Sequence, residues 1–207
     1  ALAAALLALG LFWLLVGRAL RRLRPWLLGG GATAGAAMLA AHALAFAPAG
    51  ASLAPGSSAL PEALAIASAA TSAALLGGSC TAMVLGHWYL VIPSLEVRHL
   101  QRIVRFHIAS LVLRGLVVGL IVLLAARGAL PAGVELGAYV TSLEGVFFWQ
   151  RVLFGLAAPA VLAWLTWETA KIRSTQSATG ILYVDFFTIV VGEGLAKYLW
   201  LATGLPL

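Results

Sequence analysis

The sequence predicts an all-α integral membrane protein, a bundle of about six transmembrane helices with the N-terminus and the C-terminus both outside. Of its 207 residues, 62% are hydrophobic and only 10% are charged, and the mean hydropathy is +1.02. A soluble domain carries roughly 25% charged residues. Several apolar runs also reach or approach the ~20 residues that a helix needs to cross a bilayer. The segments between these runs are short, so we expect a single domain over residues 1–207.

Six apolar segments predict the helices, and Pro, Gly and charged residues separate them. The first follows directly from Ala1 and leads into arginines rather than a small-residue cleavage site, so we expect a helix there and not a signal peptide. Between the third and fourth segments, residues 94–105 alternate apolar and charged side chains, as an interfacial amphipathic helix does. The six segments are approximately 2–17, 26–48, 61–92, 106–126, 144–168 and 180–203.

Basic residues in the short connections indicate the orientation, because Lys and Arg favour the cytoplasmic side. We therefore expect Gln101 inside and Ser57 outside, in the inner membrane of a bacterium. The isoelectric point of about 10.3 then reflects topology and lipid contact, and nucleic-acid binding is excluded. The second and fourth connections carry only Arg127, against nine residues in the first, third and fifth: Arg18, Arg21, Arg22, Arg24, Arg98, Arg102, Arg105, Lys171 and Arg173.

Small residues on the second and third segments predict close helix packing. Gly31 and Gly35 are four residues apart, as are Ser68 and Ser72. Such faces let helix backbones approach one another in lipid. The single cysteine, Cys80, excludes a disulfide framework and a Cys-ligated metal site, and we interpret it as a packing residue.

Ionisable side chains at membrane depth are costly, which makes each a candidate functional group. At 1.5 Å rise per residue, one group maps to a layer near the cytoplasmic side. Within it we expect Arg114 to pair with Asp185. The group comprises His87, His107, Arg114 and Asp185, with Trp88, Tyr89 and Tyr183 around them.

A second charged layer maps toward the outer side. It contains His42, Arg151, Glu193 and Lys197. We expect Glu193 to be ionised and bonded to Arg151 or Lys197. Both layers also have a purely structural interpretation, because aromatic residues form ordinary interfacial belts and buried ion pairs can simply fix helix register.

Two redox ligands suit the inner layer. A membrane haem b is held by axial imidazoles from neighbouring helices, and His87 and His107 are candidates, with Gly86 leaving room beside the ring. His42 has no histidine partner at its depth, so at most one such haem is expected. A quinone needs only an apolar slot, a hydrogen-bond donor and a group that moves protons. Trp88 and Tyr89 are further candidate contacts.

The last segment resembles a known family. Residues 190–207, "VVGEGLAKYLWLATGLPL", resemble the last helix of dimethyl-sulfoxide-reductase-type and NrfD-like membrane anchors, in which Gly-Glu precedes a basic residue and aromatic residues. Gly192, Glu193, Lys197, Tyr198 and Trp200 match that pattern. The resemblance implies electron exchange with the quinone pool beside an iron–sulfur subunit. Lys197 stands where Arg is usual, and those anchors generally have more helices.

The sequence therefore favours a membrane subunit of a respiratory or photosynthetic electron-transfer complex that handles quinone, with one haem b as a further candidate cofactor. Asp185 would accept protons, with Arg114 as its electrostatic partner. We expect lipid and other subunits as partners. One alternative is a structural subunit that bridges cofactor-bearing neighbours, and another is a small-solute or ion transporter, although the sequence shows no internal repeat. No hydrolase, ATPase or metalloprotease motif is present.

Overall fold

The chain folds as a bundle of long apolar helices. Five helices in the described residues are long and apolar enough to cross a membrane, and those residues contain no strand. These helices suit a lipid bilayer, as the composition predicts. The predicted first helix, 2–17, lies almost entirely outside the described part. The computed structural model describes residues 3, 6, 7, 10, 24–46, 59–92, 94–130 and 134–207.

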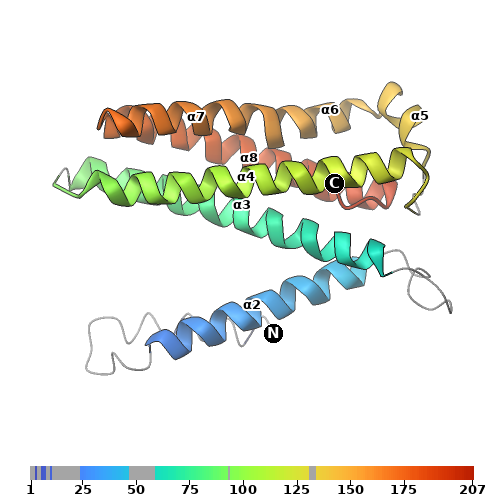
Figure 1. Cartoon of the computed structure of the whole chain (residues 1–207), viewed down its shortest axis with the longest axis horizontal. Helices are drawn as coiled ribbons and strands as arrows, with labels where there is room; N and C mark the ends of the chain where they lie inside the picture. Colours follow the sequence, from blue (N-terminus) through green and yellow to red (C-terminus); the bar gives the residue numbers. More distant parts are fainter. Residues whose placement is uncertain are drawn as a thin grey trace.

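The long helices other than α2 lie lengthwise side by side, and α2 crosses beside them at an angle (Figure 1). The α3 helix packs on α4 and α8, and α7 packs on α8 and α4. The elements are α2 (Arg24–Phe46), α3 (Leu60–Val91), α4 (Val97–Ala126), α5 (Leu136–Thr141), α6 (Val146–Val152), the π-helical turn η2 (Leu153–Ala157), α7 (Ala158–Lys171) and α8 (Thr175–Thr203).

The fifth predicted segment, 144–168, is one span, Val146–Lys171, interrupted by a wide turn. The π-helical turn ends just before Pro159. Proline has no N–H to donate, and its ring clashes with the carbonyl four residues earlier. The wider turn accommodates that clash, and such turns often occur at functional sites.

Two helices begin earlier than the sequence predicts. The α4 helix starts at Val97 rather than 106, and α8 starts at Thr175 rather than 180. Leu100 and Val104 are fully buried, so the amphipathic stretch faces the bundle. The prediction of a separate interfacial helix over 94–105 is therefore wrong, because the charged side chains occupy only the other side of a continuous helix.

In the described part of the chain, the predicted small-residue face of α2 makes no close helix contact at Gly35. A Cβ added at Gly35 would meet nothing within 4 Å. The α2 helix touches the bundle near its C-terminal end, where Ala43 packs with Ala65, Ala69 and Trp200. The close approach occurs instead between α8 and η2.

Glycines permit that approach. A Cβ added at Gly192 would lie 2.2 Å from the Cα of Gly155, so neither position has room for a side chain. The α3 and α8 helices also approach closely at Gly86, where a Cβ would lie 3.1 Å from the Thr179 hydroxyl. Thr179 donates that hydroxyl to the Gly86 carbonyl at 2.9 Å.

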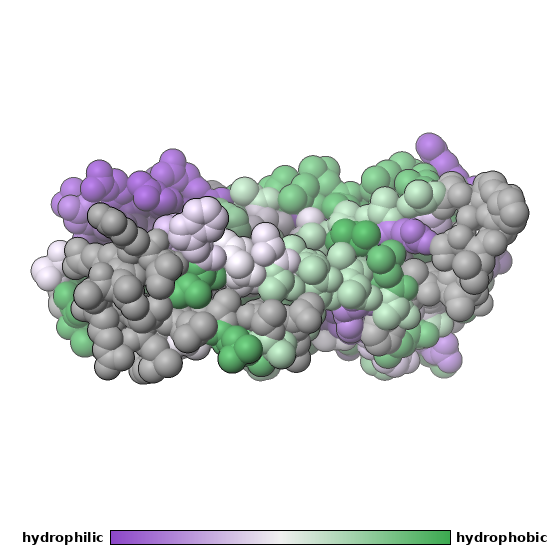
Figure 2. Space-filling view, turned by 90° about the horizontal axis from the view of Figure 1, so that it is seen from below, coloured by the Kyte–Doolittle hydropathy of each residue, from purple (hydrophilic) through white to green (hydrophobic). Residues whose placement is uncertain are grey.

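The surface divides by polarity along the long axis. Figure 2 shows hydrophilic residues gathered at the end where α3 ends and α4 begins, with more apolar residues along the middle of the visible face. Exposed apolar side chains such as Val112 and Leu116 suit contact with lipid chains. Arg127 lies at the other end, where α4 stops. Five basic residues occupy the hydrophilic end: Arg98, Arg102, Arg105, Lys171 and Arg173.

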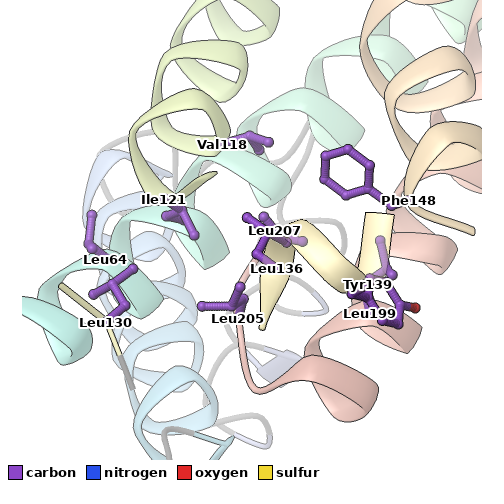
Figure 3. Close-up of a cluster of buried hydrophobic side chains, with 10 residues drawn as sticks. All are labelled: Leu64, Val118, Ile121, Leu130, Leu136, Tyr139, Phe148, Leu199, Leu205 and Leu207. Atoms are coloured by element: carbon purple, nitrogen blue, oxygen red, sulfur yellow. The ribbon is translucent and has the colours of Figure 1, made fainter. Parts of the chain in front are cut away.

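After α8 the chain turns back into the bundle. Gly204 has a φ of 76°, a left-handed conformation that glycine adopts readily, and its amide donates to the Trp200 carbonyl at 2.9 Å. Leu205 and Leu207 are then almost fully buried. Figure 3 shows them among the apolar side chains contributed by α3, α4, α5, α6 and α8. This segment brings a backbone oxygen to a buried arginine, as described below.

Candidate functional site

A histidine and a carboxylate meet in the middle of the bundle. His107 and Asp185 each lie ten residues after the start of their helix, about 15 Å along it, and α4 and α8 start at the same end. His107 Nε2 is 2.8 Å from Asp185 Oδ2, and both side chains are fully buried. The two groups are close but are not aligned as a regular hydrogen bond. Neither His107 Nδ1 nor Asp185 Oδ1 has a hydrogen-bond partner among the described residues.

A denser charged cluster lies farther along the same two helices. Arg114 and Glu193 are 17 and 18 residues from their helix starts, roughly 25 and 27 Å. Arg114 donates through Nε and Nη2 to the two Glu193 oxygens, each at 3.0 Å. It also donates through Nη1 to the Ser68 hydroxyl at 2.7 Å and through Nη2 to the Leu207 oxygen at 3.0 Å. All of these hydrogen bonds are buried.

Two more groups complete this cluster. Arg151 Nη2 donates to Glu193 Oε1 at 3.2 Å, and the Ser72 hydroxyl donates to Glu193 Oε2. The other Arg151 nitrogens, Nε and Nη1, have no hydrogen-bond partner in the described part of the chain. They pack on η2, where a Cβ at Gly155 would lie 1.8 Å from Nη1. We call Ser68, Ser72, Arg114, Arg151 and Glu193 the arginine cluster.

The structure corrects one predicted pair and confirms another. Arg114 does not pair with Asp185, because the early starts of α4 and α8 place it level with Glu193 instead. Glu193 does bond Arg151, as the sequence predicts. Lys197, the other predicted partner of Glu193, lies with Nζ 5.4 Å from the ring centre of Trp200. Arg114 therefore belongs with Glu193 of the predicted outer layer and not with Asp185 of the inner layer.

His87 and Trp88 line a pocket at the end of α3. His87 Nδ1 lies 2.9 Å from the Tyr183 hydroxyl of α8. The pocket has a volume of about 300 Å³, and its other lining residues are Val91 and Ile92. We call it the His87 pocket. It is an apolar hollow with one titratable ring in its wall.

Tyr89, predicted to contact a cofactor, is buried and bonded to the chain itself. Its hydroxyl donates to the Glu96 carbonyl and accepts from the Leu100 amide at 3.3 Å. These bonds fasten the turn between α3 and α4. Tyr89 therefore positions this turn and does not line the His87 pocket.

The two histidines proposed as haem ligands are not brought together. A Cβ at Gly78 would lie 3.6 Å from the Cα of His107, so His107 is level with Gly78. His87 lies nine residues farther along α3, about 13.5 Å away in depth. One iron cannot accept both rings in this arrangement. The predicted common depth is wrong because α4 begins nine residues earlier than 106.

His42 lies apart from both groups. It is exposed and lines a pocket of about 220 Å³ between α2 and α8, together with Lys197, Trp200 and Leu201. Of the predicted outer layer, only Arg151 and Glu193 form an ion pair with each other.

Sequence reasoning missed several residues of the arginine cluster. The sequence indicates a packing face at Ser68 and Ser72, and their four-residue spacing does place both hydroxyls on one side of α3. The backbone oxygen of Leu207 has no sequence signal, since any residue could supply it.

Comparison of the chain with protein-family models, curated proteins and solved structures finds no match. The resemblance of residues 190–207 to quinone-linked anchors thus stays a prediction. The described residues hold no group of three or more His, Cys, Asp or Glu side chains that could bind a metal ion.

Proposed function

We propose that this protein is an integral membrane subunit of a respiratory or photosynthetic electron-transfer complex and that it binds a quinone head group in the His87 pocket. The observation that carries the proposal is a polarised histidine in an apolar hollow at the end of a membrane helix: His87, hydrogen-bonded to Tyr183, beside Trp88. Ligand pockets are typically apolar with a few placed polar groups, which is the composition found here.

The hydrogen bond prepares His87 to donate. When the Tyr183 hydroxyl donates to Nδ1, the neutral ring carries its proton on Nε2, and that N–H is available to a quinone carbonyl. The pocket volume, about 300 Å³, is at the lower end of typical ligand pockets, so it suits a ring with its isoprenoid tail in the lipid. Trp88, 56% exposed, offers an aromatic face for that ring.

Quinone reduction takes up two electrons and two protons, and this chain would supply the protonic part. Electrons would come from a partner subunit. His87 can pass its Nε2 proton to the carbonyl oxygen to which it donates, while the Tyr183 hydroxyl gives its proton to Nδ1 and is itself reprotonated from water. The buried His107–Asp185 pair can hold a further proton in the bundle, and Asp185 lies two residues beyond Tyr183 on α8. Haem is not part of the proposal, because His87 and His107 lie at different depths.

Binding of short-chain ubiquinone and menaquinone analogues to the purified full chain in lipid nanodiscs tests the proposal. His87→Leu removes the donor and should weaken binding roughly five- to tenfold, the effect of one hydrogen bond of about 1–1.5 kcal/mol. Tyr183→Phe should weaken it by a smaller factor. His42→Leu is the matched control, since His42 lies in a different pocket, and it should bind as the wild type does. Unchanged affinity of His87→Leu would rule the site out.

A second candidate function is a structural subunit that bridges cofactor-bearing neighbours. The arginine cluster favours it, because one carboxylate ties α3, α4, α6 and α8 together. This alternative predicts that no quinone analogue binds in the His87 pocket or in the pocket beside His42. It also predicts that Glu193→Gln releases the chain from its complex. Quinone binding that depends on His87 would contradict it.

The proposal includes an orientation of the bundle in the membrane. The excess of basic residues at the end where α4 and α8 begin supports a cytoplasmic location for that end, in the inner membrane of a bacterium. In a Cys80→Ala background, a cysteine at Gln176 should then be protected from an impermeant maleimide applied to whole cells with a permeabilised outer envelope. A cysteine at Leu143, which is 95% exposed at the opposite end, should react. The reverse pattern would invert the topology.

A further inference from the structure

A larger pocket lies at the basic end of the bundle, and no histidine lines it. It has a volume of about 560 Å³ and is formed where the α3–α4 turn meets the α7–α8 turn. The Gln101 side chain donates to the Ala170 carbonyl at 3.2 Å, which joins α4 to the end of α7 beneath it. We call it the arginine pocket; its lining residues are Leu95, Glu96, Val97, Arg98, Gln101, Arg173 and Thr175.

The charges of this lining leave an excess of one positive charge. Arg98 and Arg173 contribute two, and Glu96 removes one. Arg98 Nη2 bonds Glu96 at 2.7 Å, but both side chains are well exposed, at 69% and 64%, so the pair is weak. A guanidinium has five N–H donors, and one bond to Glu96 leaves the others for an anion.

The backbone holds Arg173 in an uncommon conformation. Its φ is 62°, and it is the only residue other than glycine with a positive φ in the described part of the chain. The Thr175 amide donates to the Arg173 carbonyl at 3.0 Å, which closes this turn. A left-handed conformation is unfavourable for a residue with a Cβ, so glycine would fit the turn better than arginine does. The turn itself does not require the guanidinium.

We propose that the arginine pocket binds the phosphodiester of an anionic phospholipid. A phosphodiester carries one negative charge, which balances the one excess positive charge, and its oxygens accept the forked guanidinium donors. An exposed apolar residue beside Arg173, Ile172, flanks the pocket and suits the acyl chains. Basic pockets between membrane helices commonly bind such headgroups. This inference is independent of the quinone proposal.

Lipid retention by the purified full chain tests the inference. The chain is reconstituted in nanodiscs of phosphatidylcholine with a minor share of phosphatidylglycerol, and native mass spectrometry counts the phosphatidylglycerol that stays bound after release. Arg173→Gly and Arg98→Gln should each reduce retention roughly fivefold, the effect of one basic residue near an anionic lipid. Arg102→Gln is the matched control, since Arg102 lies on the same helix end but does not line the pocket. It should retain lipid as the wild type does.

Folding is measured in the same samples. Arg173→Gly should melt no lower than the wild type, because glycine relieves the left-handed turn, so lost lipid there cannot reflect lost structure. Equal losses for Arg102→Gln and the pocket variants would mean only general surface attraction and would overturn the site. A second arm adds inorganic phosphate to the nanodiscs that contain phosphatidylglycerol. If phosphate binds the pocket and displaces phosphatidylglycerol at equal concentration, the lipid assignment is wrong.

Discussion

The bundle contains two buried ionic groups on the same pair of helices, and they are built differently. In the arginine cluster, Glu193 receives hydrogen bonds from Arg114, Arg151 and Ser72, which come from three other helices. In the other group, His107 meets Asp185 alone, and each side chain keeps a polar atom without a partner among the described residues. In the arginine cluster the carboxylate is held by several fixed donors, although Arg151 Nε and Nη1 lack partners among the described residues, whereas in the second group the carboxylate itself has an oxygen without a partner there.

This difference separates a structural role from a chemical one. Several buried hydrogen-bond donors stabilise the ionised form of a carboxylate and so oppose its protonation. A lone His–Asp pair has two alternative positions for one proton and few contacts to break when the proton moves. We therefore expect the arginine cluster to hold the bundle together and His107–Asp185 to exchange protons. The following variants can break or sharpen that contrast.

The largest effect is expected at Glu193. Glu193→Gln keeps the shape but removes the charge that compensates Arg114 and Arg151, and a buried charge without its partner costs roughly 3–5 kcal/mol. The free energy of unfolding in mixed micelles should fall by that amount. Glu135→Gln is the control, because Glu135 is exposed, and it should change little. Equal stability of the two variants would contradict the structural role of the cluster.

The next effect concerns the contact that brings Arg151 to Glu193. A Cβ at Gly192 would meet the Gly155 backbone at 2.2 to 2.5 Å, and backbone cannot rotate away as a side chain can. Gly192→Ala should therefore destabilise the bundle by about 1–3 kcal/mol through overpacking. Gly194→Ala, on the same helix with nothing within 4 Å of the new methyl group, should be neutral or slightly stabilising. Equal melting temperatures for both variants would show that the helices are farther apart.

A loss of stability similar to that of Gly192→Ala is expected at the His107–Asp185 pair. Asp185→Asn keeps the size of the side chain and changes only its contact with His107. The free energy of unfolding should therefore fall by about 1–3 kcal/mol, less than for Glu193→Gln. In the proposed quinone reaction, Asp185→Asn should also lower the rate of proton uptake. A loss as large as that of Glu193→Gln would mean that both groups are structural.

The smallest effect is expected at the turn beside the His87 pocket. Tyr89→Phe removes the hydroxyl that bonds Glu96 and Leu100, which should cost about 0.5–1.5 kcal/mol. Tyr198→Phe is the matched change at a 46% exposed tyrosine and should cost less. If Tyr89→Phe also weakened quinone binding as much as His87→Leu does, Tyr89 would belong to the binding site after all.

The sequence by itself determined the membrane character, the third helix to within a residue at each end, and that Glu193 bonds Arg151 or Lys197, of which the structure shows Arg151. Hydrophobic length and the high cost of a lone charge in hydrocarbon suffice for these conclusions. It did not determine the starts of α4 and α8, because residues 97–105 have one charged side and Leu100 and Val104 become buried only when neighbouring helices cover them. The predicted depth of a residue is counted from the start of its helix. Because α4 starts earlier than predicted, Arg114 lies level with Glu193 rather than Asp185, and His107 lies at a different depth from His87. Which residues pair was decided by the tertiary structure, since α4 and α8 run in parallel and place groups of equal depth side by side.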